Sequence, residues 1–152
     1  MKKRYLLLVF SIFAVGTARA QTKDVHITEH DPAVATRDSL IKMQIIDSAV
    51  LAAGNAAPDW AALTTTIRQR YDSMSADRTV TTAKIYYYYG KDWSRFTATI
   101  VHYTDNYEEA TNYPLLNKNA NFILKFSVDP TEWKAALAWN TTAMHGDPNN
   151  DD

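Results

Sequence analysis

Hydrophobic positions recur at spacings of three and four along most of the chain, which is the period of an amphipathic α-helix. The first run follows Asp31-Pro32, an N-cap aspartate with proline in the first turn, and ends at Gly54-Asn55. The second begins at Pro58-Asp59-Trp60 and continues to a predicted break at Ser73 to Asp77. The apolar positions of the two runs are Leu40, Ile41, Met43, Ile45, Ile46, Ala49, Val50 and Ala53, then Leu63, Ile67 and Tyr71.

The segment "KIYYYYGKDW", from Lys84 to Trp93, allows two interpretations. Its tyrosines and the β-branched residues after them favour a β-hairpin around Gly90. An internal repeat favours helices, because "DWAALTTTI" from Asp59 recurs as "DWSRFTATI" from Asp92. A period in the thirties is typical of stacked helical pairs. We therefore expect one helix to end at Gly90 and the next to be capped by Asp92, with one or two tyrosines buried.

Two further helices are predicted towards the C-terminus. One runs from Pro114 to Phe126, and the other starts at Asp129-Pro130 with Glu132 at the third helical position and closes at Gly146. The pattern as a whole predicts an all-α fold of about six helices in antiparallel pairs, forming a helical-repeat stack. The expected organisation is a secretory signal peptide at 1–20, a flexible leader at 21–30, an α-helical repeat domain at 31–146 and an acidic tail at 147–152.

The N-terminal segment has the features of an export signal. Lys2, Lys3 and Arg4 precede an apolar stretch, and Ala18-Arg19-Ala20 places small residues at the positions that a signal peptidase reads. Loss of residues 1–20 removes four basic residues and no acidic one, so the formal charge changes from −1 to −5. We expect a periplasmic or secreted protein that does not remain in the membrane after cleavage.

The amino-acid composition excludes further classes of function. The chain contains no cysteine, which excludes thiol–disulfide chemistry and disulfide cross-links. The mildly acidic balance argues against nucleic acid as a partner. A protein or peptide partner is expected, and no cofactor is required.

The C-terminal segment resembles known helical-repeat families. Ala136, Ala143 and Pro148 have the spacing of the small residues and terminal proline in the second helix of a tetratricopeptide (TPR) repeat. Leu116 to Asn121 and Ala136 to Trp139 also resemble parts of the helical tail that follows the catalytic domain in some exported bacterial thioredoxin-family proteins. These likenesses imply a TPR-like fold. They imply no activity, because the Cys-x-x-Cys motif is absent.

Short motifs suggest other chemistry. His26, Glu29 and His30 form H-x-x-E-H, the inverted signature of zinc hydrolases, although no apolar residues surround it. The residues Asp147, Asn149 and Asp151 alternate like the start of a calcium loop, which lacks its glycine and distal glutamate. Isolated His102 and His145 indicate no site.

We therefore predict a binding or scaffolding module without catalytic activity. The alternatives are a stand-alone or truncated accessory tail of a thioredoxin-family oxidoreductase, and a zinc hydrolase. Trp60 and Trp93 are expected to anchor equivalent helix pairs. The last helix has too few polar residues to cover an outer face. Some of Trp139, Ala143 and Met144 are therefore predicted to form an exposed interaction surface that supports self-association or capture of a partner helix.

Overall fold

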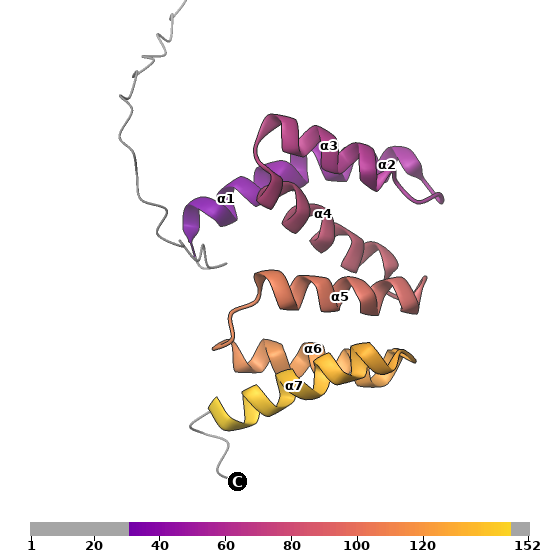
Figure 1. Cartoon of the computed structure of the whole chain (residues 1–152). Coiled ribbons are helices and arrows are strands. Elements are labelled where there is room, and N and C mark those ends of the chain that lie inside the picture. The colour runs from indigo at the N-terminus through magenta and orange to yellow at the C-terminus, as the bar shows by residue number, and fades with distance from the viewer. Residues whose placement is uncertain (1–30, 147–152) are drawn as a thin grey trace, which may run out of the picture.

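Helices alone make up the regular structure of residues 31–146, the part of the chain described by this computed structural model. Figure 1 shows them stacked in layers, from α1, α2 and α3 at one end to α6 and α7 at the other. The prediction of an all-α fold with six helical segments is confirmed. The elements are α1 (Pro32–Ile41), η1 (Lys42–Ile46), α2 (Asp47–Ala53), α3 (Trp60–Arg70), α4 (Ser73–Tyr88), α5 (Trp93–Tyr107), α6 (Tyr113–Phe126) and α7 (Pro130–Gly146).

The first segment is one continuous helix with a π-helical turn in its middle. In η1 the Asp47 N–H donates to the carbonyl of Lys42, five residues earlier. Ile41 and Ile46 are both buried although they are five residues apart. A regular α-helix would place such residues on different sides, and the wider turn brings them back to the core. Met43, which the periodicity placed on the apolar face, is instead exposed.

Aspartates cap the helices where the sequence predicts caps. Asp31, Asp59 and Asp92 each accept a hydrogen bond from a backbone N–H in the first turn that follows. Before α7, Asp129 accepts from the Thr131 N–H at 2.7 Å. Glu132 accepts from the hydroxyl of Ser127, so this glutamate reaches back beyond the cap. These local interactions confirm the predicted helix starts.

The predicted break at Ser73 to Asp77 is wrong, because these residues form the first turns of α4. The chain turns instead at Tyr71 and Asp72. The Asp72 carboxylate accepts from both the N–H and the hydroxyl of Ser75, at 2.6 and 2.9 Å. Ser75 is fully buried. Serine, which local sequence associates with a turn, here completes a helix cap inside the protein.

The tyrosine run is helical as far as Tyr88 and ends at Gly90, whose φ of 72° is a left-handed conformation that favours glycine. Tyr88 is buried, whereas Tyr86 and Tyr89 are exposed. Consecutive side chains spread around a helix, so only Tyr88 is buried, and Tyr87 packs half-buried against the same core cluster. The helix–turn–helix interpretation of this segment is confirmed.

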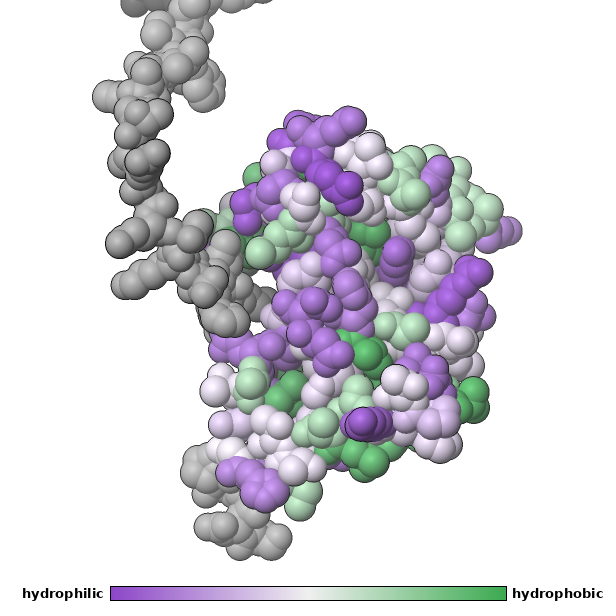
Figure 2. All heavy atoms as spheres, viewed as in Figure 1, coloured by the Kyte–Doolittle hydropathy of each residue, from purple (hydrophilic) through white to green (hydrophobic). Residues whose placement is uncertain are grey.

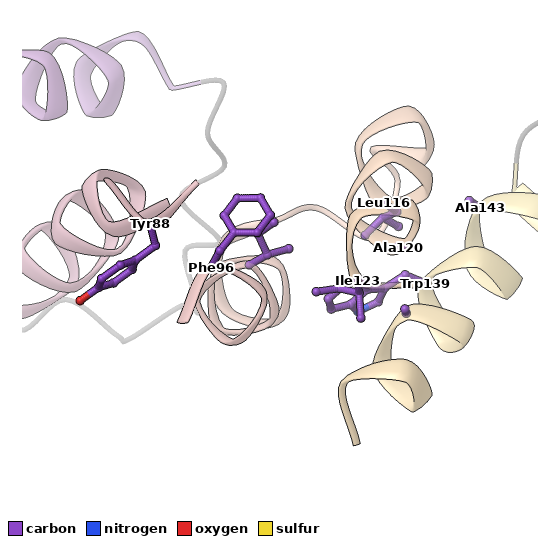
Figure 3. Packing of buried hydrophobic residues seen from close by; sticks show 9 residues of the cluster. Tyr88, Phe96, Leu116, Ala120, Ile123, Trp139 and Ala143 are labelled. Atoms are coloured by element: carbon purple, nitrogen blue, oxygen red, sulfur yellow. The ribbon is translucent and has the colours of Figure 1, made fainter. Parts of the chain in front are cut away.

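Two clusters of buried residues form the core, and α4 contributes to both. The upper cluster is aliphatic and joins α1, η1, α3 and α4. The lower one contains aromatic rings and joins α4 to α7 (Figure 3). The upper cluster consists of Ile41, Ile46, Leu63, Ile67, Ala76 and Val80. The lower cluster consists of Tyr88, Phe96, Ile100, Leu116, Ala120, Ile123, Ala136, Trp139 and Ala143.

The predicted exposed surface on the last helix is wrong for two of its three residues. Trp139 and Ala143 are buried against α6, as Figure 3 shows, and only Met144 is exposed. The Trp139 Nε1–H donates to the Asp105 carboxylate of α5 at 3.1 Å, which fixes the indole inside the protein. The outer face of α7 carries Trp133 and Leu137 instead. Hydrophobic residues gather over α6 and α7 in the lower part of Figure 2.

Candidate ligand-binding groove

A cleft of ≈ 720 Å³ lies between the first helical segment and α4. Val34, Ile46 and Val50 contribute apolar surface from the first segment, and Ala83 contributes from α4. The π-helical turn forms part of this wall, because Lys42, Ile46 and Asp47 all line the cleft. Pockets of this size that are mainly apolar, with a few polar groups, are typical of ligand sites.

An ion pair holds the two walls of this cleft together. Arg78 on α4 donates from Nε and Nη2 to the two carboxylate oxygens of Asp38 on α1, at 2.6 and 2.8 Å. Its hydrogen bonds with Asp38 raise the pKa of the Arg78 guanidinium, against the opposing effect of burial. Arg78 is 5% exposed, so this pair is a fixed part of the cleft wall.

A second cleft, of ≈ 520 Å³, continues from the first towards α6. Ile85 on α4, Ile100 on α5 and Leu115 on α6 give it an apolar lining. Its only charged lining residue among the described residues is Lys118. A shallower hollow follows along α6, and it shares Lys118 and Phe122 with the second cleft.

The two clefts and the hollow form one groove, because Thr82, Tyr86 and Tyr103 line both clefts and the hollow shares Lys118 with the second cleft. Tyr86 is 76% exposed, so an aromatic side chain projects from α4 where the clefts meet. On the other side of α4, Tyr88 accepts a hydrogen bond from the Trp60 indole at 3.0 Å. The tyrosine run thus anchors α4 in the core and also supplies the groove with an aromatic group.

Lys91 lies at the edge of the groove, directly after the helix-ending glycine. Its Nζ is 3.9 Å from the centroid of the Tyr87 ring, a cation–π contact that orients the side chain over the first cleft. Tyr87 packs edge-on against Trp60 and Tyr88. The position of this surface charge is therefore set by the same aromatic cluster that anchors α4.

A separate polar cluster joins α4 to α5. The Asp77 carboxylate accepts a hydrogen bond from the Tyr107 hydroxyl and lies 2.7 Å from His102 Nε2. Burial opposes ionisation of Asp77, but these two hydrogen bonds, together with Coulombic attraction to His102 and Lys84, lower its pKa. Burial and the bond to Asp77 raise the pKa of the Tyr107 phenol. This cluster explains His102, which the sequence presents as isolated.

The predicted metal motifs lie outside the described residues. His26, Glu29 and His30 precede residue 31, and Asp147, Asn149 and Asp151 follow residue 146. Within 31–146 no group of three or more His, Cys, Asp or Glu side chains could hold a metal ion. His145, also within that range, contacts the Thr141 carbonyl through Nδ1. The zinc hydrolase therefore stays an untested alternative, and the calcium-like pattern, which lacks its glycine and distal glutamate, is not predicted to be a site.

Comparison with known protein families, curated proteins and solved structures gave no match. The resemblances to TPR repeats and to thioredoxin-family tails therefore stay predictions. No helix among residues 31–146 is long and apolar enough to cross a membrane.

Sequence reasoning missed the groove, although two of its residues gave a signal. Tyr86 follows Thr82 by four residues, which places the two on one helix face, and both line the junction of the clefts. Residues three or four positions apart lie on the same face of a helix, so spacing alone can identify such a face. The role of this face in the groove depends on the packing of α1 against α4 through Asp38 and Arg78. These two residues are forty positions apart in the chain.

Proposed function

We propose that this protein is an exported, non-catalytic helical-repeat module that binds a peptide segment of a partner protein in the groove along α4. The exposed Tyr86 between two apolar clefts carries this proposal. Tyrosine offers a large, rigid contact surface with a polar tip, and such residues are frequent among those that dominate protein interfaces.

The groove suits a peptide because its hollows succeed one another. A segment that crosses from the first cleft to the second would place side chains on both sides of Tyr86. Apolar walls would bury those side chains, and the exposed Tyr86 supplies a polar hydroxyl where the clefts meet. Export is part of the proposal and is supported by the basic, apolar and small-residue pattern of residues 1–20.

A selection from random peptides displayed on phage, with the chain lacking residues 1–20 as target, tests binding. Enriched peptides should bind the wild type and lose most of their affinity for Tyr86→Ala. Leu137→Ala on the outer face of α7 is the matched control, because Leu137 is also exposed but lies outside the groove residues. Failure to enrich any peptide, or equal binding to Tyr86→Ala, would contradict the proposal.

Export is tested separately by mass spectrometry of the protein recovered from a bacterial periplasm. The expected mature N-terminus is Gln21. Export would be contradicted if the protein were found only in the cytoplasm, with its N-terminal segment intact.

A further inference from the structure

Basic residues outnumber acidic ones along the groove, and this imbalance favours a ligand of negative charge. Two acidic residues line the first cleft, and both are engaged by cations, Asp38 by Arg78 and Asp47 by Lys42. The Lys42 Nζ lies 2.8 Å from each carboxylate oxygen of Asp47. Within each pair the positive and the negative charge cancel. They contribute little net charge to the groove.

Three further lysines remain along the groove, namely Lys91, Lys118 and Lys125. Among the described residues, no carboxylate forms an ion pair with any of them. All three are exposed. The groove therefore carries an excess of about three positive charges, on a chain whose formal charge is −1.

Aromatic rings hold two of these cations in place. Lys91 lies over Tyr87, and Lys125 lies 5.2 Å from the centroid of the Phe126 ring. Lys118 is shared by the second cleft and the hollow beyond it. The positive charges are thus spread from one end of the groove to the other and alternate with apolar surface.

We infer that the groove selects an acidic peptide, in which carboxylate side chains alternate with apolar or aromatic ones. Carboxylates would face Lys91, Lys118 and Lys125, and the apolar side chains would enter the clefts on either side of Tyr86. This inference rests on the proposed peptide-binding function. It adds the chemical class of the ligand to that function.

The observations favour a peptide over a nucleic acid, which is also anionic. Affinity for nucleic acid comes largely from many phosphate contacts. Here only three unpaired lysines among residues 31–146 line the groove, and aliphatic side chains such as Val34, Ile46 and Val50 form much of the first cleft beside its tyrosine rings. Aliphatic pockets recognise amino-acid side chains better than they recognise bases.

Three peptide libraries of equal length test the charge preference. All carry Leu, Ile, Phe or Tyr at alternate positions, and the remaining positions are Glu in the first, Ser in the second and Lys in the third. The Glu library should give the tightest binders to the chain lacking residues 1–20. Their affinity should fall as salt rises, since exposed charge pairs are screened. A mixed-sequence oligonucleotide serves as the competing anionic probe.

Charge reversal then locates the preference. Lys91→Glu and Lys118→Glu should each weaken the best Glu-library peptide by about tenfold. Lys134→Glu is the control on α7, because Lys134 is exposed and lies outside the groove, and it should change affinity less than about twofold. A Lys91→Glu/Lys118→Glu/Lys125→Glu variant should prefer the Lys library. Circular dichroism confirms that each variant keeps its helices.

The outcomes separate the two proposals. Equal affinity for the three libraries, or a preference for Ser or Lys, would overturn the acidic ligand while peptide binding survived. Tighter binding of the oligonucleotide than of any Glu-library peptide would also overturn it. Absence of binding to every library would contradict the proposed function, and the inference would fail with it.

Discussion

The upper and lower halves of the stack are held together by different interactions. Around α1, η1 and α3 the core is small and aliphatic, and charged groups add ties such as Arg78 to Asp38. Around α5, α6 and α7 the core is aromatic, with Trp93 stacked on Phe126 at 4.1 Å between ring centroids. Both halves therefore rest on an apolar core, to which the upper half adds a buried ion pair and the lower half adds ring packing.

The repeated Asp-Trp helices make this contrast visible at matched positions. Leu63 and Phe96 are equivalent in the repeat and both are buried, as are Ile67 and Ile100. The tryptophans differ, because Trp60 donates a hydrogen bond to Tyr88, whereas Trp93 is 38% exposed and stacks on a ring. Sequence repetition fixes the register of the helices without fixing the surroundings of every side chain.

The largest effect should follow the loss of a ring from the lower core. Phe96→Ala should cost about 3–5 kcal/mol of unfolding free energy, because Phe96 contacts the rings of Tyr89, Trp93 and Phe122. The matched Leu63→Ala should cost about 2–4 kcal/mol. Denaturant unfolding measures both. A cost at Leu63 well above that at Phe96 would reverse the contrast between the two halves.

A charge mutation should reveal the dependence of the upper half on its ion pair. Asp38→Asn leaves the buried Arg78 without its carboxylate and should cost about 3 kcal/mol. Asp47→Asn removes the exposed pair with Lys42 and should cost less than about 1 kcal/mol. The two ion pairs differ in burial, since the Arg78 side chain is 6% exposed and that of Lys42 is 61% exposed. Equal costs would show that burial of Arg78 is unimportant.

The structure changes the expected equivalence of the two repeat tryptophans. Trp60→Phe should cost about 1 kcal/mol, because the hydrogen bond to Tyr88 is lost and its hydroxyl remains partly buried. Trp93→Phe should cost about half as much, since phenylalanine preserves the stack on Phe126. Thermal and denaturant unfolding provide the measurement. A larger cost at Trp93 would mean that ring stacking outweighs the buried hydrogen bond.

The helix starts could be predicted from sequence, and the partners of single side chains could not. Caps such as Asp59 and Asp92 act on residues three positions away, so their signal is local. The burial of Trp139 depends on Asp105, in a helix that packs only after folding. The groove also could not be predicted from local sequence, because it arises where η1 and α4 meet. Ser73 to Asp77 was misread because a polar run is typical of both a turn and a capped helix start.

Acid should weaken the contacts that α4 makes through Asp72 and Asp77 before it affects the aromatic core of α6 and α7. The pKa values of Asp72 and Asp77 are lowered in the folded protein, so their contributions to stability are present above the unfolded value and are lost as pH falls through the folded value. Stability should therefore decrease below about pH 4. Both carboxylates are more than 40% exposed, so the loss is small. Hydrogen exchange of α4 amides measures it. Asp77→Asn should reduce the pH dependence, and an unchanged profile in that variant would exclude the cluster as its cause.

The smallest effect is expected on the outer face of α7, where the apolar residues cover no core. Leu137→Lys should change the unfolding free energy by less than about 0.5 kcal/mol, because Leu137 is 57% exposed. Ala143→Lys on the same helix should be strongly destabilising, because a charge would enter the lower core. Sedimentation of both the wild type and Leu137→Lys then tests self-association without loss of the fold. If concentrated wild type associates and Leu137→Lys does not, the outer face of α7 is the contact. If both stay monomeric, this face is an ordinary solvent-exposed surface, and the groove along α4 is the better candidate for partner binding.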